Sequence, residues 1–489
     1  MQVYRVLRNR SALMQLSAAV SLSVLLPVSQ IAAQKASSST ASRASTKNAP
    51  DWIVRPEWVE GHEKFLSSDV LHGRGSATRD EHLTATYVAS EFIAYGLKPA
   101  PGMTGYIQSA ELSSPVLTGT ATLTVGNVTL REGDDFQLLM STGASVNGAL
   151  KKVLPANVAQ AQTKGDVVFM GGEPQQAMNA ISALRRQGAA ALLLTESPAV
   201  SAFASRAGGR TRVPVTLKGS EAEAGTSVVI LKPEAAARLS AATEGTQVTL
   251  AVHQASQATP RETYNAIGYL KGTDPKAGTI LLSAHLDHLG IGRPVNGDSI
   301  YNGANDDAAG TTAVMELAHA LAAGPRLRRS VLFVCYGSEE IGELGSTYFG
   351  EHPPVPLDSL VANIEFEMIG TQDPKMPKGV LLFTGWERSN LGPALKAHGA
   401  LLGPDPYPEE HFFQRSDNYA LALQGVVAHT AAGWGTPPTY HQPDDELSRL
   451  NIPFMTSAIQ SLIKPLSWLA TSDFKPAWNP GGRPERGSR

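Results

Sequence analysis

Apolar positions follow helical spacing in one early segment of the chain and form short runs in the segments after it. In residues 81–95 (EHLTATYVASEFIAY) apolar side chains recur at helical spacing, and Gly96 stands where a helix would end. Further along, apolar runs predict buried strands over 166–170, 189–194, 228–231 and 248–252, with a helix over 175–187 between the first two. This stretch of the chain is therefore expected to be rich in strands.

From Asn265 onward, strands and helices alternate. Residues 279–283 form a buried-strand run, a helix is predicted over 310–323, and strands are predicted over 330–336 and 360–366. This order favours an α/β fold whose central sheet is mixed, mostly parallel and flanked by helices. The block 130–255 carries no charged constellation, so we interpret it as a separate, smaller β-rich module.

The amino-terminal segment has the three features of a secretory signal peptide. Basic residues at Arg5, Arg8 and Arg10 precede the apolar run 12–28, and small residues follow at 31–33. The run is short for a membrane span and contains polar residues and a proline, which favours a cleaved signal over an anchor. The sequence therefore predicts export to the periplasm or the extracellular space.

Charge and cysteine content narrow the classes of partner. The formal net charge is −3 and no basic stripe is present, which argues against nucleic-acid binding. No later segment approaches the ~20 apolar residues of a spanning helix, so no membrane association is expected after signal cleavage. Cys335 is the single cysteine and lies in an apolar run, which predicts a buried thiol without a disulfide.

Polar residues follow the predicted strands of the second half. His285 and Asp287 come directly after the run 279–283, in a spacing where an imidazole can bind a metal and a carboxylate can fix its orientation. Asp306 and Asp307 precede the helix 310–323, where a carboxylate either caps a turn or bridges two cations. The sequence alone leaves both interpretations open.

Three further groups come later in the chain. Glu339 and Glu340 follow the strand 330–336 among glycines, where one can bind a metal and the other act as a general base. Glu365 and Glu367 lie on one face of the strand 360–366 by period two, so spacing cannot choose between them, and His441 precedes a Gln-Pro turn. Together the groups form a nitrogen and oxygen ligand set suited to zinc and similar cations. Two metals ~3.5–4 Å apart would polarise a carbonyl and supply hydroxide at neutral pH.

These motifs resemble the zinc-dependent, two-metal aminopeptidase family that includes bacterial leucyl aminopeptidases. The family pattern of His-x-Asp, Gly-Ala-x-Asp-Asp-x-x-Gly, Glu-Glu-x-Gly-x-x-Gly-Ser, Asp-Met-Ile-Gly and Tyr-His-x-Pro occurs in order between His285 and Pro443, with one substitution. Residues 71–102 and 265–270 resemble the family's amino-terminal helix region and first core strand. Residues 165–169 and 189–193 resemble the protease-associated domain inserted in many members.

The resemblance implies that the catalytic domain is interrupted by the inserted domain and is preceded by a signal peptide. We expect, in chain order, a signal peptide (1–33), a flexible linker (34–50), the first segment of the catalytic domain (51–129), a protease-associated domain (130–255), the second segment of the catalytic domain (256–472) and a disordered tail (473–489).

The resemblance also implies a role for each matching residue. Asp306 would bridge two Zn²⁺ ions per chain, with the remaining ligands divided as His285 and Glu367 on one metal and Glu340 and His441 on the other. Glu339 would be the general base for the metal-activated water, and Asp287 would orient His285. Tyr440 would donate to the oxyanion, and Arg415 would contact the substrate.

Two positions depart from the family pattern. Glu367 stands where the family usually has Asp, and its longer side chain could change the metal spacing or the recognition of the amine; Glu365 remains the weaker candidate for this ligand. Asn418 stands where many members have His.

The resemblance implies a secreted zinc metallopeptidase that removes N-terminal residues from peptides with a free amino group. The sequence leaves open a carboxypeptidase or dipeptidase of the same family and a single-zinc glutaminyl cyclase. A non-enzymatic, receptor-like relative is disfavoured, because all five ligand positions carry competent side chains.

Overall fold

The computed structural model describes residues 52–172, 174–201, 211–220, 225–255 and 260–485. The predicted signal peptide (1–33) and linker (34–50) lie outside the described residues. Within the described ranges no helix is long and apolar enough to cross a membrane.

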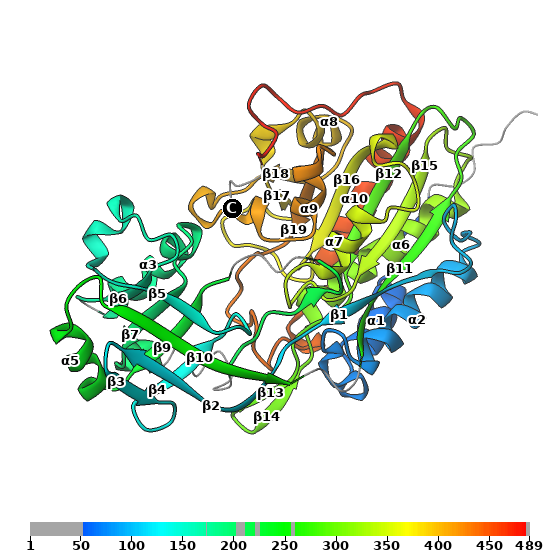
Figure 1. Ribbon diagram of the computed structural model, residues 1–489. Coiled ribbons are helices and arrows are strands. Elements are labelled where there is room, and N and C mark those ends of the chain that lie inside the picture. Colours follow the sequence, from blue (N-terminus) through cyan, green and yellow to red (C-terminus); the bar gives the residue numbers. More distant parts are fainter. Residues whose placement is uncertain (1–51, 173, 202–210, 221–224, 256–259, 486–489) are drawn as a thin grey trace, which may run out of the picture. The chain divides into compact units, whose positions relative to one another are not determined.

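A nine-stranded mixed sheet is built mostly from the second half of the chain (Figure 1). Its strands, in spatial order, are β18 (Leu402–Pro404), β17 (Leu381–Phe383), β19 (Ala428–Ala432), β16 (Leu360–Glu367), β12 (Thr279–His285), β15 (Ser330–Tyr336), β11 (Arg261–Leu270), β1 (Ile107–Ser113) and β8 (Thr216–Leu217). The central strands β15, β12, β16 and β19 are parallel, and β11 and β1 add antiparallel strands at one side. The predicted mixed α/β sheet is confirmed, with its parallel strands concentrated at the centre.

Helices cover both faces of this sheet, because successive residues of its buried strands point to opposite sides. Ile280 and Leu282 of β12 belong to one core, shared with helices α1 (Pro56–Leu66), α2 (Arg79–Ala94), α6 (Ala309–Ala323), α8 (Leu391–Ala397) and α10 (Ile452–Thr471). Leu281 of the same strand belongs to the opposite core, shared with α7 (Leu344–Glu351) and α9 (Asn418–Gln424). Helices therefore cover both faces of the sheet, and an accessible site is expected at the ends of the strands.

A second, eight-stranded sheet is built from the block between β1 and β11. Its spatial order is β3 (Val128–Arg131), β2 (Val116–Val125), β10 (Gln247–Ala255), β5 (Val146–Val153), β6 (Val167–Met170), β7 (Ala191–Thr195), β9 (Ser227–Leu231) and β4 (Phe136–Met140), with helices α3 (Pro174–Arg186) and α5 (Pro233–Ala241). Because β2 pairs with β10, this sheet begins at Val116 and not at residue 130 as predicted. A separate hairpin is formed by β13 (Gly290–Val295) and β14 (Asp298–Tyr301).

The chain end differs from the prediction of a disordered tail over 473–489. Trp478 packs near the rings of Phe413 and His429, and its indole N–H donates to the Gly425 carbonyl at 3.1 Å. The Asn479 N–H donates to the Arg388 carbonyl at 2.8 Å. The prediction is therefore wrong for residues 473–485. It relied on the Gly- and Pro-rich composition and did not consider that Trp478 could pack against the folded domain. Residues 486–489 lie outside the described ranges.

Candidate metal centre

Four of the sequence motifs meet at the carboxyl ends of the central parallel strands. β12 ends at His285 and β16 ends at Glu367, and the turn after β15 carries Glu339 and Glu340. Asp306 lies in the tight turn Ala304–Ala308 that leads into α6. Since β15, β12 and β16 are adjacent and parallel, their carboxyl ends share one edge, where open α/β sheets place their sites.

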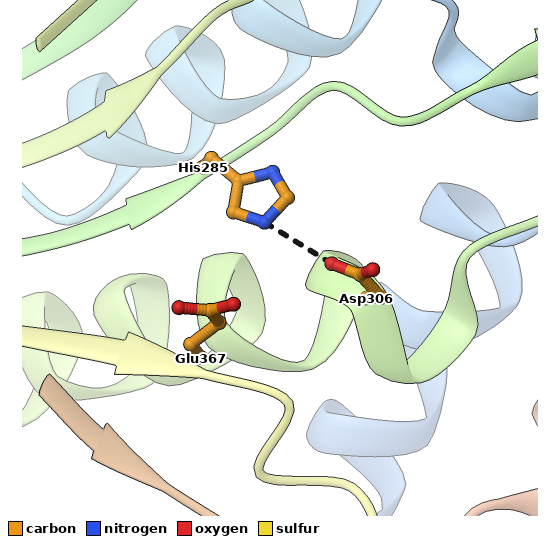
Figure 2. Close-up of side chains that lie close together, drawn as sticks. All are labelled: His285, Asp306 and Glu367. Carbon is orange, nitrogen blue, oxygen red and sulfur yellow. Dashed lines mark ion pairs between the residues drawn. The ribbon is translucent and has the colours of Figure 1, made fainter. Parts of the chain in front are cut away.

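On one side of Asp306 lie His285 and Glu367. His285 Nε2 is 3.2 Å from Asp306 Oδ1. Figure 2 shows His285, Asp306 and Glu367 pointing toward a common space. One ligand atom from each of the three lies within 4.8 Å of the other two. They are the three residues that the family resemblance assigned to one of the two metals.

On the other side of Asp306 lie Glu340 and two histidines. His441 Nε2 is 3.3 Å from Asp306 Oδ2 and 3.2 Å from Glu340 Oε2. His288 Nδ1 is 2.7 Å from Glu340 Oε1, and His288, Asp306 and Glu340 form a second group of atoms within 4.8 Å of one another. Asp306 thus belongs to both groups, the arrangement expected of a bridging carboxylate, and His288 was not among the predicted ligands.

Several potential ligand atoms of this centre are buried without a hydrogen bond in the described part of the chain, as expected of atoms that bind a cation. His285 Nε2, Asp306 Oδ2 and Glu340 Oε1 are buried and make no hydrogen bond among the described residues. Buried polar atoms without an aligned hydrogen bond cost free energy, which a cation bound between them would offset. Imidazole nitrogen and carboxylate oxygen at these positions are a ligand set that zinc accepts.

The electrostatics of the centre also favour cation binding. Burial raises the pKa of Asp306, but contacts with His285 and His441 outweigh it and hold that pKa well below its usual range. Burial lowers the pKa of His441, but Asp306 and Glu340 raise it to about 10. Protons on the imidazoles therefore balance the carboxylates, and these are the protons that a bound metal displaces.

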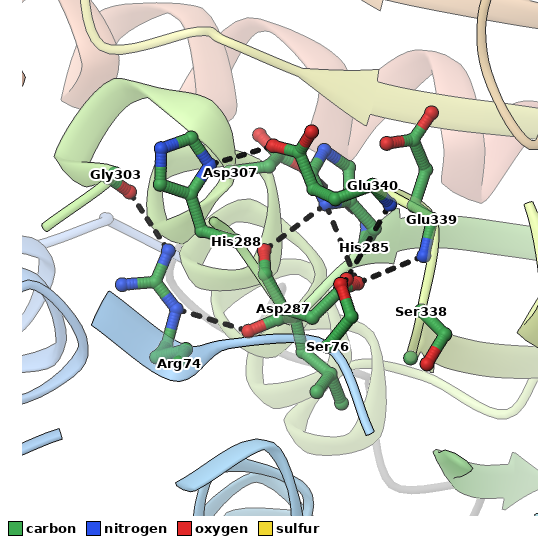
Figure 3. A network of polar contacts seen from close by, with 12 residues as sticks. Arg74, Ser76, His285, Asp287, His288, Gly303, Asp307, Ser338, Glu339 and Glu340 are labelled. Atoms are coloured by element: carbon green, nitrogen blue, oxygen red, sulfur yellow. Dashed lines mark hydrogen bonds and ion pairs between the residues drawn. The ribbon is translucent and has the colours of Figure 1, made fainter. Parts of the chain in front are cut away.

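Asp287 holds the turn that carries the two glutamates (Figure 3). Its carboxylate accepts hydrogen bonds from the main-chain N–H groups of Glu339 at 3.0 Å and Glu340 at 3.4 Å, and from the Ser76 hydroxyl at 2.5 Å. The contact expected with His285 is made instead by the main-chain carbonyl of Asp287, 3.2 Å from Nδ1, whereas the nearest Asp287 carboxylate oxygen is 3.8 Å away. Asp287 therefore contacts the glutamate turn through its carboxylate and the His285 ring through its main-chain carbonyl.

Glu81 of α2 supports the same turn and was not identified from the sequence. Its carboxylate accepts hydrogen bonds from the Ser338 hydroxyl at 3.0 Å, the Thr263 hydroxyl at 2.9 Å and the Tyr264 N–H at 2.9 Å. Burial and the nearby charge of Asp287 raise the pKa of Glu81 to about 8. Its position three residues after the N-cap Thr78 was the one local signal, since acids at this position often bond back toward the cap.

Asp307 ties β12 and β16 together. Its carboxylate accepts from the main-chain N–H groups of Met368 and Gly310, each at 2.9 Å, and of His285 at 3.3 Å. Burial raises the pKa of Asp307 well above its usual value. Asp307 thus fixes the chain on either side of the ligands His285 and Glu367.

Glu365, the alternative to Glu367, lies deeper in the sheet. It is fully buried, and neither group of candidate ligands includes it. Burial, together with the charges of Asp417 and Glu367, raises its pKa well above the usual value. The geometry therefore favours Glu367 as the ligand on β16.

Tyr440 and Arg415 line a hollow beside Glu367, as expected of residues near a substrate. The other lining residues are Met368, Leu382, Thr384, Phe412, Thr430, Ala432 and Gly435. Arg415 is exposed and lies 3.4 Å from Glu410. Burial, together with the carboxylates of Asp306, Glu340 and Glu367, raises the pKa of Tyr440 far above its usual value, so this hydroxyl keeps its proton.

Strained backbone gathers at the same place. Ser338, Met368 and His441 each have a positive φ, between 53° and 55°, which side chains rarely adopt. These residues respectively precede Glu339, follow Glu367 and belong to the candidate ligand set. Such strain persists where the surroundings fix it, and it is concentrated at functional sites.

Comparison with known proteins shows which family the centre resembles. Residues 265–464 match the model of Peptidase family M28, which confirms the family resemblance of the five motifs. Aminopeptidase YwaD of Bacillus subtilis (strain 168) is 25% identical over 248 residues, covering 49% of this chain and 50% of that protein. Leupeptin-inactivating enzyme 1 of Streptomyces exfoliatus is 32% identical over 209 residues, covering 38% of this chain and 44% of that protein. The chain thus spans about half the length of these curated relatives or less.

Solved structures show the same fold. The aminopeptidase from Aneurinibacillus sp. strain AM-1 aligns with a TM-score of 0.53 at 19% identity, covering 88% of this chain and 98% of that one. The zinc aminopeptidase BSAP from Bacillus subtilis aligns with a TM-score of 0.50 at 20% identity, covering 86% and 97% of the two chains.

Proposed function

Because residues 265–464 match the model of Peptidase family M28, we propose that the protein is a zinc-dependent aminopeptidase that removes N-terminal residues from peptides. The observation that carries the proposal is the position of Asp306, whose two carboxylate oxygens face separate groups of ligand atoms. Relatives named as aminopeptidases support the choice among peptidase activities.

Two zinc ions per chain fit this centre. His285 and Glu367 would hold one with Asp306, and Glu340 and His441 would hold the other with Asp306. When bound, zinc polarises the scissile carbonyl and makes water a competent nucleophile at neutral pH.

Glu339 is the general base of the proposed reaction. Its main chain is fixed by Asp287, and its carboxylate belongs to neither group of candidate ligands. Burial and the neighbouring charge of Glu340 raise the pKa of Glu339 above its usual value, which suits a group that accepts a proton and passes it on. Glu339 takes a proton from the attacking water and returns it to the leaving amine.

Tyr440 and Arg415 act on the substrate. The Tyr440 hydroxyl remains protonated and lies beside the ligand His441, with ring centroids 3.9 Å apart, so it donates to the oxyanion of the tetrahedral intermediate. Arg415 supplies a positive charge for the peptide backbone from the rim of the hollow beside Glu367. The apolar members of that hollow receive the side chain of the N-terminal residue.

We further propose that the protein is exported. The basic start, apolar run and small-residue end of residues 1–33 support a cleaved signal peptide, with the periplasm or the medium as destination. We interpret the eight-stranded sheet as the protease-associated domain, on the likeness of residues 165–169 and 189–193 to that domain. Fractionation of cells and sequencing of the mature amino terminus test the export proposal.

A panel of matched peptides tests the activity. Peptides with a free amino group, the same peptides acetylated at that end, and the same peptides amidated at the carboxyl end separate the candidate enzymes. We expect cleavage from the amino end that acetylation abolishes and amidation leaves intact. Loss of cleavage on amidation would identify a carboxypeptidase, and release of pyroglutamate from N-terminal Gln would identify a cyclase.

A further inference from the structure

His288 is a fully buried histidine at the second group of ligand atoms, and neither the general base nor the substrate contacts account for it. Its Nδ1 lies 2.7 Å from Glu340 Oε1 and 3.9 Å from Asp306 Oδ2. Its ring is 5.7 Å from that of His441, measured between centroids. His288 therefore faces the same carboxylates as His441, from the closed side of the centre.

Both ring nitrogens of His288 are buried, and neither makes an aligned hydrogen bond among the described residues, although Nδ1 is in an ion pair with Glu340. The Glu340 oxygen that it approaches is likewise buried and makes none. A buried imidazole is normally hydrogen-bonded through at least one nitrogen, because an unpaired buried polar atom costs free energy. His288, Asp306 and Glu340 each offer one atom within 4.8 Å of the other two, a spacing at which the three can bind one cation.

The surroundings hold this ring in place. Gly303 lies directly against it, since a Cβ at Gly303 would be 2.5 Å from His288 Cγ. The buried Arg74 fixes this contact by donating from Nη2 to the Gly303 carbonyl at 2.8 Å, and its own carbonyl accepts from the His288 N–H at 3.1 Å (Figure 3). Ligands that are held by their surroundings before the metal arrives bind it in a defined geometry.

We propose that His288 is a fourth protein ligand of the second cation, beside Asp306, Glu340 and His441. This inference rests on the proposed two-zinc function and gives the two sites different tasks. With His288 the second site would have four protein donors, the number typical of a structural zinc, whereas the three donors His285, Asp306 and Glu367 would leave the first site open to water and substrate. The second site consequently fills first and releases its zinc last.

Zinc titration of the metal-free enzyme against a chromophoric chelator tests the proposal. We expect two zinc-binding steps for the wild type. In H288Q the zinc affinity of the tighter step should fall at least ~10-fold, because losing even a residue that only orients a ligand commonly lowers metal affinity by that factor. H285Q should weaken the other step, and H253Q, at an exposed histidine of β10, should weaken neither. Unchanged affinities in folded H288Q would overturn the proposal.

Zinc-edge X-ray absorption of the wild type with one equivalent of zinc shows whether His288 binds the metal or only lies near it. The measurement needs no variant. Two imidazoles per zinc at ~2.0–2.1 Å are expected if His288 and His441 both bind the first ion. One imidazole per zinc would overturn the proposal that the first ion is bound by both His288 and His441. Failure of the proposed function would look different, because the wild type would then bind no zinc or would cleave no peptide when loaded.

Discussion

The carboxylate of Asp445 accepts a hydrogen bond from the main-chain N–H of Asp306, with Oδ2 3.0 Å from the nitrogen. The same carboxylate accepts from the Asn305 N–H at 3.1 Å, and the Asp445 carbonyl accepts from the Ala304 N–H at 3.0 Å. Asp445 follows His441 by four residues, so the segment that supplies one ligand is fastened to the turn that supplies the bridging carboxylate. Asp445 is buried and belongs to neither group of ligand atoms.

This arrangement predicts that D445N weakens zinc binding without removing a ligand. A neutral amide replaces the carboxylate, so the N–H groups of Asn305 and Asp306 both lose their charged partner, at a cost of about 1.5–3 kcal/mol. We expect zinc affinity to fall about 10–100-fold, as for other groups that orient ligands from outside. Equilibrium zinc titration measures the change.

Asp444 supplies the matched control for this prediction. It is the neighbouring residue and pairs with Arg449 on the surface, at 3.0 Å, with its side chain 54% exposed. Exposed pairs contribute about 1 kcal/mol or less, so D444N should retain both zinc affinity and activity. If D445N and D444N bound zinc equally well, the proposed coupling between the two segments would be incorrect.

A second prediction concerns the division of labour between the adjacent glutamates. E339Q should lower kcat by about 10²–10⁴ while leaving two zinc ions bound, because the amide cannot accept the proton from water. E340Q should instead lose zinc, since Glu340 lies 3.2 Å from His441 and 2.7 Å from His288. Steady-state kinetics together with metal analysis of both variants check the assignment. Normal turnover in zinc-loaded E339Q would exclude it as the base.

The ligand positions could be anticipated from sequence because they follow apolar strand runs directly. His285 and Glu367 end strands whose hydrophobic pattern is plain, and parallel neighbours bring such ends to one edge. Asp306 and Glu340 occur in turns with many small residues that mark tight connections. Local pattern and one topological rule were enough to place these motifs at one edge of the sheet, whereas the choice of individual ligands within each motif came from the family resemblance.

Residues that act through long-range main-chain contacts could not be anticipated in this way. Arg74 is fully buried and donates to the carbonyls of Leu66, Leu286, Asn302 and Gly303, although arginine is typically exposed. Neither Arg74 nor Asp445 lies in an apolar run that would indicate burial. The sheet boundary at Val116 was missed for the same reason, because the partner strand β10 lies more than a hundred residues away.

Metal removal should have a structural consequence as well as a catalytic one. Without zinc, the buried carboxylates and imidazoles of the centre depend on protons for charge balance, and binding stabilises the folded state by mass action. At free zinc 100-fold above Kd the gain is about 2.7 kcal/mol per site. We therefore expect a chelator to abolish activity and lower Tm, and added zinc to restore both. Chelator-resistant turnover would contradict the metal mechanism.

The last prediction concerns His429 of β19, which is buried away from the metal ligands. Its Nδ1 lies 2.8 Å from the Thr384 carbonyl, which can only accept, so Nδ1 carries the proton of the neutral ring. Nε2 lies 2.7 Å from the Ser389 hydroxyl and accepts from it. Burial lowers the pKa of His429 from 6.5 to about 4, because the charged ring would lose its solvation.

Since this pKa is depressed in the folded state, its contribution to stability is present above pH 6.5 and is lost as the pH falls toward 4. The loss amounts to about 3 kcal/mol at the acid end. We expect the free energy of unfolding of H429N, whose amide can still donate to Thr384, to fall less steeply over this range than that of the wild type. Denaturant unfolding at several pH values measures both slopes. Parallel curves would mean that His429 is not held neutral by its surroundings.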